Sequence, residues 1–343
     1  MSTAQPAHAE LPPHVQLMQM ASGYWISKII YAAAKLDLAD HLADGPRTAD
    51  ELAGPTGTHA PSLHRLMRTL GGLGVLTSTD DRSYSLTPMG EALKTGAPGS
   101  ARSVALSFGS PAFVLAFEQI MHSLQTGETG FEKAFGMPVF DYFAQHTDEA
   151  SLFSETMVGL NGGEAVAVAE AYDFSGVGSV VDVGGATGNM LAAILARHAG
   201  PRGILFDMAH VVADAPALLE KNGVADRVTI ESGSFFESVP AGADAYIVSH
   251  IIHDWSEDQC LTILGNIRKA MKPDSRLLIV EMVLPPGDTP HPGKILDIVM
   301  LVCPGGQERT PDEYEALLSK AGFRMTRVVP TESPVSIVEA VLA

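Results

Sequence analysis

A glycine-rich turn is the first place where this sequence could bind a ligand. The apolar run SVVDV leads directly into GGATG and then into NMLAAILARHAG, which places Gly184, Gly185 and Gly188 at the start of a helix. Glycines allow the backbone to approach a ligand closely, and the free N–H groups at a helix start attract polar groups. A tight turn between a strand and a helix can have the same composition without a ligand, so the neighbouring residues must decide between the two interpretations.

Two aspartates narrow the class of ligand. The turn departs from the dinucleotide pattern G-x-G-x-x-G, and Asp182, just before it, would repel a pyrophosphate but tolerate a sulfonium. Asp207 ends the next expected strand, in GILFDM, where a carboxylate can accept hydrogen bonds from both ribose hydroxyls. Together, the turn and Asp207 predict an adenosine-type ligand.

His253 is a candidate for proton transfer. It lies in HDWSED, just after an expected strand over Ala245–Ile252, at the edge of the sheet where open α/β folds bind ligands. A single histidine is more often structural than catalytic. His250, three residues earlier, could suggest a metal site. The two histidines do not share a helix face, however, and no third ligand stands at a recognised spacing, so we predict no metal.

The elements around these residues predict an α/β sheet. From about residue 176, short apolar strands alternate with helices, which is typical of a parallel sheet. Capping boxes at Ser256 with Gln259 and at Thr310 with Glu313 predict two helices, and the apolar stripe of the first makes Cys260 a core thiol. The expected strands are Ser179–Val183, Gly203–Phe206, Val228–Glu231, Ala245–Ile252 and Arg276–Val283, followed by an antiparallel pair, Arg324–Val329 and Ser336–Val341.

The N-terminal part has the pattern of a winged helix. Buried helices are expected over Val15–Leu42, a short helix in TADELA, and a second helix over Ala60–Leu70. A two-stranded wing is expected in VLTSTDDRSYSLTP, with its turn at Asp80 and Asp81. This unit could bind DNA, or its apolar helices could bind a partner chain.

Charge and composition decide between these interpretations. The 343-residue chain has a formal net charge of −18, and the second helix offers only His64, Arg65 and Arg68 as cations. Nucleic-acid affinity depends on neutralising phosphates, so we predict no nucleic-acid partner. We also expect a soluble cytoplasmic protein without a membrane partner. No apolar run is long enough to cross a bilayer, the N-terminus lacks a secretory signal, and only two cysteines are present.

The order of five segments resembles that of one enzyme family. These segments are VVDVGGATG, FDMAHVV, SHIIHDWSEDQ, LLIVEMVLP and MLVCPGGQERT. They stand as in the S-adenosylmethionine-dependent O-methyltransferases of the caffeic-acid type, a group that includes bacterial antibiotic and pigment methyltransferases. The resemblance covers almost the whole chain. It implies a Rossmann-like α/β domain, with helices on both faces of a mostly parallel seven-stranded sheet, preceded by a mainly helical, winged-helix-like dimerisation domain.

The resemblance also implies a homodimer formed through the N-terminal domain. We predict a winged-helix-like dimerisation domain over 1–110, a helical linker and substrate-pocket region over 111–175, and a catalytic domain that binds S-adenosylmethionine over 176–343. One long helix over Ser151–Tyr172, with Gly162 and Gly163 inside it, is expected to link the domains.

The resemblance assigns cofactor-binding residues by position. Gly184 matches the glycine against the methionine part of the cofactor, and Ser249 matches a polar cofactor contact. Ser234 stands where the family usually has an aspartate that binds the adenine amine, so we expect weaker or water-mediated adenine recognition. The expected set is Asp182, Gly184, Gly185, Asp207, Met208, Ser234, Phe235 and Ser249, the expected product is S-adenosylhomocysteine, and no metal is expected.

The resemblance makes His253 the general base, with Glu281 and Glu308 as the acids that flank it. Two carboxylates there would orient the imidazole and stabilise its protonated form, although each could instead be a surface or helix-start charge. Methyl transfer to an anionic oxygen neutralises charge, so a dry pocket favours it. Ordinary pKa values of about 6.5 for histidine and about 10 for a phenol leave a gap of roughly 5 kcal/mol. Phenols are therefore preferred as acceptors, with the less acidic alcohols kept open.

Four further residues are expected near a small hydroxylated acceptor. Met157 and Met300 match apolar clamps around an aromatic ring, unless they belong to the core, and Asp254 touches the acceptor or caps a turn. Cys303 replaces an asparagine that many plant relatives use, which argues against a phenylpropanoid acceptor. Two other functions stay open: relatives that bind S-adenosylmethionine but hydroxylate or decarboxylate, which generally lack the histidine, and a DNA-binding regulator that senses a small molecule.

Overall fold

The computed structural model describes residues 11–78, 80, 82–97, 101–161 and 163–343. These residues form two compact units. Unit 1 comprises Met1–Val114 and His146–Leu160, and unit 2 comprises Leu115–Gln145 and Asn161–Ala343. The limits do not follow the predicted linker region over 111–175, which is divided between the two units.

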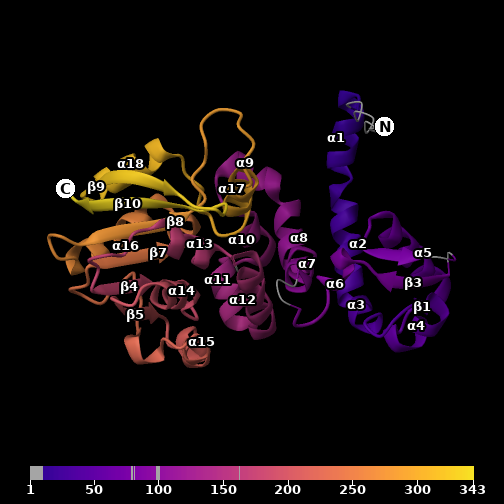
Figure 1. Ribbon diagram of the computed structural model, residues 1–343. Coiled ribbons are helices and arrows are strands. Elements are labelled where there is room, and N and C mark those ends of the chain that lie inside the picture. The colour runs from indigo at the N-terminus through magenta and orange to yellow at the C-terminus, as the bar shows by residue number, and fades with distance from the viewer. Residues whose placement is uncertain (1–10, 79, 81, 98–100, 162) are drawn as a thin grey trace, which may run out of the picture. The chain divides into compact units, whose positions relative to one another are not determined.

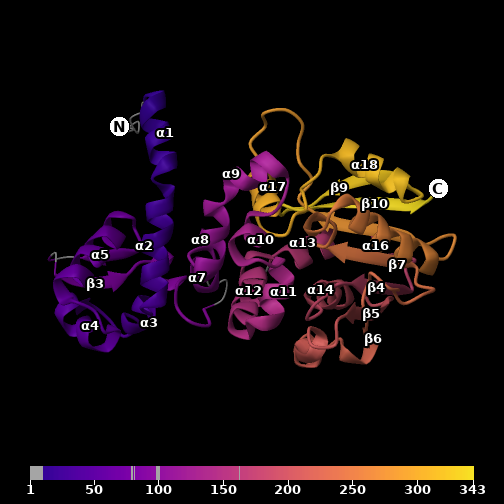
Figure 2. The same ribbon diagram turned by 180° about the vertical axis from the view of Figure 1, so that it is seen from behind.

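Unit 2 contains the predicted seven-stranded sheet, in the order β6-β5-β4-β7-β8-β10-β9. Five strands are parallel, and β10 is antiparallel to both of its neighbours. Figures 1 and 2 show β9 and β10, in yellow, at one edge of this sheet. The strands are β4 (Ser179–Val183), β5 (Arg202–Asp207), β6 (Val228–Ser232), β7 (Ala245–Ser249), β8 (Arg276–Glu281), β9 (Phe323–Pro330) and β10 (Ser336–Leu342).

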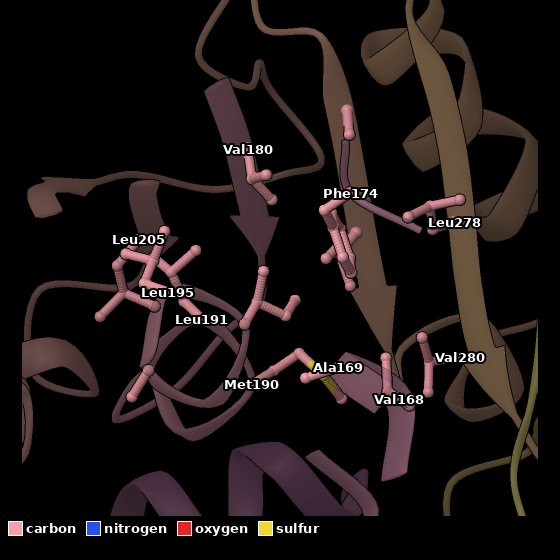
Figure 3. Close-up of a cluster of buried hydrophobic side chains, with 14 of the residues drawn as sticks. Val168, Ala169, Phe174, Val180, Met190, Leu191, Leu195, Leu205, Leu278 and Val280 are labelled. Carbon is pink, nitrogen blue, oxygen red and sulfur yellow. The ribbon is translucent and has the colours of Figure 1, made fainter. Parts of the chain in front are cut away.

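Alternate residues of the central strands point to opposite sides of the sheet, and both sets are mainly apolar. Helices therefore cover both faces. Val180 packs with residues of α13 (Glu164–Ala171), α14 (Asn189–Arg197) and α15 (Ala215–Lys221). Figure 3 shows it near Leu191 and Leu205. The next residue, Val181, packs with residues of α16 (Glu257–Ala270) and α18 (Pro311–Lys320) on the other face. The remaining helices are α8 (Pro111–Glu118), which crosses the boundary between the units, and α9 (Ile120–Thr126), α10 (Gly130–Phe135), α11 (Val139–Gln145) and α17 (Gly293–Val302) of unit 2.

Both predicted capping boxes are confirmed. The Gln259 side chain accepts a hydrogen bond from the Ser256 N–H at 3.2 Å, and that of Glu313 accepts one from the Thr310 N–H at 2.8 Å. Cys260 lies on the buried stripe of α16 and is fully buried, as predicted for a core thiol. These caps fix the starts of the two helices that cover one face of the sheet.

Three predicted elements are wrong in extent. The strand β8 ends at Glu281, not at Val283. The strand β7 ends at Ser249, not at Ile252, because His250 has a φ of 53° and turns the chain into a short 3-10 helix over Ile252–Asp254. The expected long helix over Ser151–Tyr172 is two helices, α12 (Thr147–Asn161) and α13, with Gly163 as the N-cap of α13. Gly162 lies outside the described residues.

Unit 1 has the predicted winged-helix pattern. Its core contains Leu52, Met67 and Leu70, and the strands pair in the order β1-β3-β2. Asp80 accepts hydrogen bonds from two backbone N–H groups of the wing turn, whereas Asp81 lies outside the described part of the chain. The elements are α1 (Pro13–Ala21), α2 (Gly23–Lys35), α3 (Leu38–His41), β1 (Arg47–Thr48), α4 (Ala49–Thr56), α5 (Ala60–Gly72), β2 (Leu76–Ser78), β3 (Ser83–Leu86), α6 (Pro88–Glu91), α7 (Arg102–Phe108) and α12.

The prediction that the first helices are buried is wrong for α1 in the single chain. This helix has no buried residue, and its Leu17, Met18 and Met20 are between 66% and 75% exposed. Trp25 of α2 is equally exposed. The helical spacing of apolar residues predicted the helices correctly, but spacing alone does not distinguish a core from a surface that another chain covers.

Candidate active site

The predicted ligand residues of unit 2 lie at one edge of its sheet. Gly184 follows β4, Asp207 ends β5, Ser249 ends β7 and Glu281 ends β8. Because these strands are parallel neighbours, their carboxyl ends lie side by side. The fold therefore brings together residues that are almost a hundred positions apart in the sequence.

The glycine turn after β4 is closed to side chains. Gly184 has a φ of 73°, and a Cβ atom there would overlap the side chain of Ile251 and lie 3.5 Å from the ring of Phe235. A Cβ atom on Gly185 would overlap the Asp182 carboxylate. The Gly184 N–H donates to the Phe206 carbonyl at 2.8 Å, which fixes the turn. The glycines thus let the turn pack directly against Ile251 and Asp182 at the sheet edge.

Asp182 is a buried carboxylate without an ion-pair partner in the described part of the chain. It is fully buried, and neither of its oxygens accepts a hydrogen bond from the part of the chain that the structure describes. Burial, and secondarily the charge of Asp207, raises its pKa to about 7. Buried charges in proteins are normally paired. A cationic ligand beside the glycine turn would compensate this carboxylate, and a pyrophosphate would not.

Asp207 is fixed by the backbone and remains able to bind a ligand. Its Oδ1 accepts from the Met208 N–H at 2.7 Å and its Oδ2 from the Ala186 N–H at 3.0 Å. Burial raises the pKa of this carboxyl. Each carboxylate oxygen has a second lone pair, so the group can still accept hydrogen bonds from two hydroxyls. This chemistry fits a ribose.

The loop around Phe235, which is expected to bind adenine, is held by Asn266, a residue that the sequence analysis did not identify. Asn266 of α16 donates to the carbonyls of Phe235 at 3.0 Å and Phe236 at 2.9 Å. The Ser234 hydroxyl accepts from the Phe236 N–H at 3.3 Å, which stabilises the turn. Phe235 is therefore the residue of this loop that lies beside the glycine turn.

His253 forms a buried pair with Glu308. Its Nδ1 lies 2.6 Å from Glu308 Oε1, and both side chains are almost completely buried. Glu281 accepts a hydrogen bond from the backbone N–H of His253 at 3.0 Å, so it fixes the main chain rather than the ring. Asp254 Oδ1 lies 3.6 Å from Nε2. The imidazole is thus oriented through Nδ1, which leaves Nε2 for proton transfer.

Three further residues, also missed from the sequence, hold this pair in place. Tyr314 of α18 donates a hydrogen bond to Glu281, and Asp297 of α17 accepts one from the backbone N–H of Glu308 at 2.9 Å. A Cβ atom on Gly306 would overlap the carbonyl of His253, to which the Gln307 N–H donates at 2.9 Å. The glycines in CPGGQERT therefore let the Glu308 loop approach the histidine closely. A contact between segments about fifty residues apart has no local signal in the sequence.

The carboxylates around His253 favour its protonated form. Burial by itself would lower its pKa, but the charges of Asp254, Glu308 and Glu281 together raise it to about 10. Burial also raises the pKa of Asp254 to about 6. A strongly perturbed histidine at a sheet edge is typical of a functional site.

The predicted acceptor residues fall in both units. Met300 and Cys303 are buried in unit 2, in and just after α17, and burial raises the pKa of the Cys303 thiol to about 12. The ring of Phe140 stacks on Trp255 at 5.3 Å between centroids. Met157 belongs to α12 of unit 1, so its role at the acceptor stays a prediction.

The described residues contain neither a metal-binding cluster nor a membrane-spanning helix. No group of three or more His, Cys, Asp or Glu side chains there could hold a metal ion. No helix within the same residues is both long and apolar enough to cross a membrane.

Family models match most of the chain. Residues 117–324 match the O-methyltransferase domain, and residues 18–96 match the O-methyltransferase dimerisation domain. This chain belongs to the O-methyltransferase family. The match includes the glycine turn, His253, Glu281 and Glu308, and it confirms the resemblance drawn from the five sequence segments.

Individual members of the family resemble the chain over nearly its full length. It is 45% identical to phenazine O-methyltransferase PhzM of Lysobacter antibioticus over 324 residues, 94% of this chain and 95% of that one. The structure of the mitomycin 7-O-methyltransferase MmcR is 37% identical with a TM-score of 0.90, covering 96% and 98% of the two chains. The methyltransferase NcsB1 from neocarzinostatin biosynthesis, solved with S-adenosylmethionine and 2-hydroxy-5-methyl naphthoic acid, is 31% identical with a TM-score of 0.81, covering 93% and 96%.

These findings confirm the predicted fold and chemistry. The chain is an S-adenosylmethionine-dependent O-methyltransferase with a Rossmann-like catalytic fold, and its N-terminal part is an O-methyltransferase dimerisation domain. The cofactor also fits the site. Within the described residues the buried Asp182 has no hydrogen-bond partner, the glycine turn excludes side chains, and Asp207 can accept from a ribose.

Proposed function

We propose that this O-methyltransferase uses His253 as the general base on a hydroxyl of a small aromatic acceptor. The observation that carries this proposal is the buried pair of His253 with Glu308, at 2.6 Å. A carboxylate on Nδ1 fixes the imidazole orientation and directs Nε2 toward a proton donor, as a general base requires.

The electrostatics around His253 suit a phenol. An unperturbed imidazole lies several pKa units below a phenol, but the surrounding carboxylates raise the pKa of His253 to about 10, close to the phenol value of about 10. Once His253 has lost its own proton, transfer of the phenol proton to it costs little free energy, because the two pKa values match. An aliphatic alcohol, with a pKa near that of water at about 15.7, would still resist deprotonation.

The cofactor, when bound, supplies an electrophilic methyl group on a sulfonium. We assign its binding to Asp182, Gly184, Gly185, Asp207, Met208, Ser234, Phe235 and Ser249. The Asp207 carboxylate would bind the ribose, and Phe235, beside the glycine turn, would cover the adenine ring. The Ser234 hydroxyl already accepts a backbone hydrogen bond, which supports weaker adenine recognition at that position.

The relatives support an aromatic acceptor. One is named for a phenazine and one for a mitomycin, and NcsB1 was solved with a hydroxylated naphthoic acid. Met157 and Met300 would pack on an aromatic ring, and Asp254 would contact the acceptor near Nε2 of His253. Cys303, buried where plant relatives use an asparagine, would contribute an apolar wall, because its thiol stays protonated.

We also propose that the functional molecule is a homodimer formed through unit 1. The dimerisation domain matches this unit, and its α1 exposes Leu17, Met18 and Met20. Exposed apolar faces of this kind are typical of surfaces that a second chain covers.

Two free cysteines, Cys260 and Cys303, support the prediction of a reducing cytoplasm. The proposed function involves no nucleic acid, membrane or metal.

The test is the release of S-adenosylhomocysteine by the purified protein against phenols, quinone-type polyketides, flavonoids and hydroxylated carotenoids. His253→Ala should lower turnover by at least about a hundredfold and leave cofactor binding unchanged. The matched control is His59→Ala, an exposed histidine of unit 1. Unchanged turnover in His253→Ala would remove His253 from the mechanism. Tight cofactor binding without product on any acceptor would favour the relatives that hydroxylate or decarboxylate.

A further inference from the structure

A second histidine and glutamate pair lies beside the first. His250 Nε2 lies 2.7 Å from Glu164 Oε2, and the His250 ring lies 5.1 Å from that of His253, measured between centroids. Glu164 begins α13 and is buried, with 5% of its surface exposed. The proposed mechanism uses neither residue, although a buried carboxylate is costly unless it is paired.

The backbone at His250 is in an uncommon conformation. Its φ of 53° lies in the left-handed region, which glycine adopts readily and other residues seldom do. The His250 N–H donates to the Val280 carbonyl at 3.1 Å, so the turn is anchored to β8. Strained backbone of this kind is concentrated at functional sites. A histidine therefore occupies a backbone position that glycine would adopt with less strain, which suggests that its side chain has a function.

One ring nitrogen of His250 remains available to a ligand. Nε2 is taken by Glu164, and Nδ1 has no hydrogen-bond partner among the residues that the structure describes. The side chain is 17% exposed, so the ring is accessible as well as anchored. The pairing with Glu164 resembles that of His253 with Glu308, in which a carboxylate orients the ring and leaves the other nitrogen free.

We propose that His250 is a specificity-determining residue that hydrogen-bonds a second oxygen substituent of the acceptor, on the ring carbon next to the methylated hydroxyl. The proposal rests on the role assigned to His253. Two rings 5.1 Å apart can each reach one of two adjacent substituents, whereas a substituent at the far end of a fused aromatic system would be out of reach. Glu164 acts as a positioning residue, because it holds the His250 ring.

Charge supports this assignment. The carboxylates of Glu164, Asp254, Glu281 and Glu308 lie around the two rings and would repel an anionic oxygen. In its imidazolium form, with Nε2–H donated to Glu164, His250 can donate a hydrogen bond from Nδ1–H to such an oxygen. A site with a donor placed in this way discriminates strongly against an analogue that lacks the acceptor group.

Contact with the cofactor is the competing interpretation. The glycine turn approaches Ile251, the neighbour of His250, since a Cβ atom on Gly184 would overlap the Ile251 side chain. The His250 ring instead meets Glu164 and His253. The His250 side chain therefore lies beside His253 rather than beside the glycine turn. A measurement of cofactor binding distinguishes a role in acceptor recognition from a role in cofactor binding.

Calorimetry with two probes tests the proposal without turnover. The probes are 2-naphthol and 3-hydroxy-2-naphthoic acid, which differ by a carboxylate next to the hydroxyl, and the protein is the full chain saturated with S-adenosylhomocysteine. The variant is His250→Asn, because asparagine tolerates the left-handed conformation. We expect wild type to bind the hydroxy acid at least about tenfold more tightly than the naphthol, and His250→Asn to lose that preference.

The controls separate a specific role from a structural one. His250→Asn should change the affinities for naphthol and S-adenosylhomocysteine by less than about twofold, and Glu164→Gln, which keeps an acceptor for Nε2, should retain part of the preference. Exposed His59→Asn should change nothing. Equal loss for both probes, loss of S-adenosylhomocysteine binding, or no preference in wild type would overturn the proposal. Failure of the His253 mechanism would appear separately, as undiminished turnover in His253→Ala.

Discussion

The two units differ in how completely each buries its own apolar surface. In unit 2, helices cover both faces of the sheet, and Tyr246, Ile247 and Val248 of the central strand β7 are fully buried. In unit 1, a small core coexists with α1, which buries none of its residues. A unit with a complete core can hold side chains in fixed positions for chemistry, as at His253. A unit with an uncovered apolar face is suited to bind another chain.

The largest expected effect is a substitution that damages the cofactor turn of unit 2 alone. Gly184→Ala combines left-handed strain with overlap of the new Cβ atom on Ile251, so the affinity for S-adenosylhomocysteine should fall by at least about a hundredfold in calorimetry. Gly176→Ala is the matched control. It carries the same strain, at a φ of 81°, but its Cβ atom would have no neighbour within 4 Å.

The outcome for Gly184→Ala separates two explanations of the turn. If Gly184→Ala binds the cofactor as well as Gly176→Ala does, the close approach of the turn to Ile251 does not contribute to cofactor binding. Light scattering should show an unchanged oligomeric state in both variants, because the dimerisation domain lies in unit 1.

The sequence predicted unit 2 well because its signals are local. Alternating apolar strands, the GGATG turn and the two capping boxes each depend on a few neighbouring residues, and each is present at its predicted place in the chain. The strand β7 was predicted too long, because His250 looks compatible with a strand and adopts a left-handed conformation instead. A single unusual dihedral angle leaves no pattern in the sequence.

The contacts that hold the site were not predictable from the sequence in the same way. Tyr314 supports Glu281, Asn266 holds the Phe235 loop, and Glu164 binds His250 across 86 positions. Each depends on how distant elements pack, which residue type and spacing do not specify. The resemblance to a family indicated His253 and Glu308, but the distance between them required the structure.

A change in unit 1 should affect association and spare the cofactor site. Trp25→Glu places a charge on a side chain that is 68% exposed, beside the uncovered face of α1, and should weaken a dimer by at least about tenfold. Light scattering at micromolar concentration should then report a lower mass than for wild type. Met89→Glu, at a 60% exposed residue of α6, is the control. A monomeric wild type, or an unchanged mass in Trp25→Glu, would contradict the dimer proposal.

The pH dependence of turnover tests the proton balance inside unit 2. The reactive complex shares one proton between His253, with a pKa of about 10, and a phenol of similar pKa. Below both values each group carries its proton and one must be lost, so kcat/KM should rise about tenfold per pH unit between pH 6 and 9. A nitro-substituted phenol, which ionises near neutrality, should reach a plateau earlier. A flat profile for an ordinary phenol would contradict the raised pKa of His253.

The smallest expected effect is on the stability of unit 2 without cofactor. Burial raises the pKa of Asp182 from its ordinary 3.8 to about 7, so the folded state binds this proton more tightly than the unfolded state does. The contribution to stability is full below pH 4 and is lost as the pH rises to 7. Asp182→Asn cannot ionise, so at pH 8 its Tm should exceed that of wild type by several degrees, with no difference near pH 4.

Asp173→Asn supplies the opposite control. Hydrogen bonds to Ser175 lower the pKa of this exposed carboxyl, so removing its charge should bring no gain in Tm at pH 8. Adding S-adenosylmethionine should raise the Tm of wild type more than that of Asp182→Asn, because only the carboxylate attracts the sulfonium. A lower Tm in Asp182→Asn at pH 8 would mean that the carboxylate has a partner in the folded protein. If instead the Tm rises, unit 2 keeps an uncompensated charge that destabilises the empty fold and favours the bound cofactor.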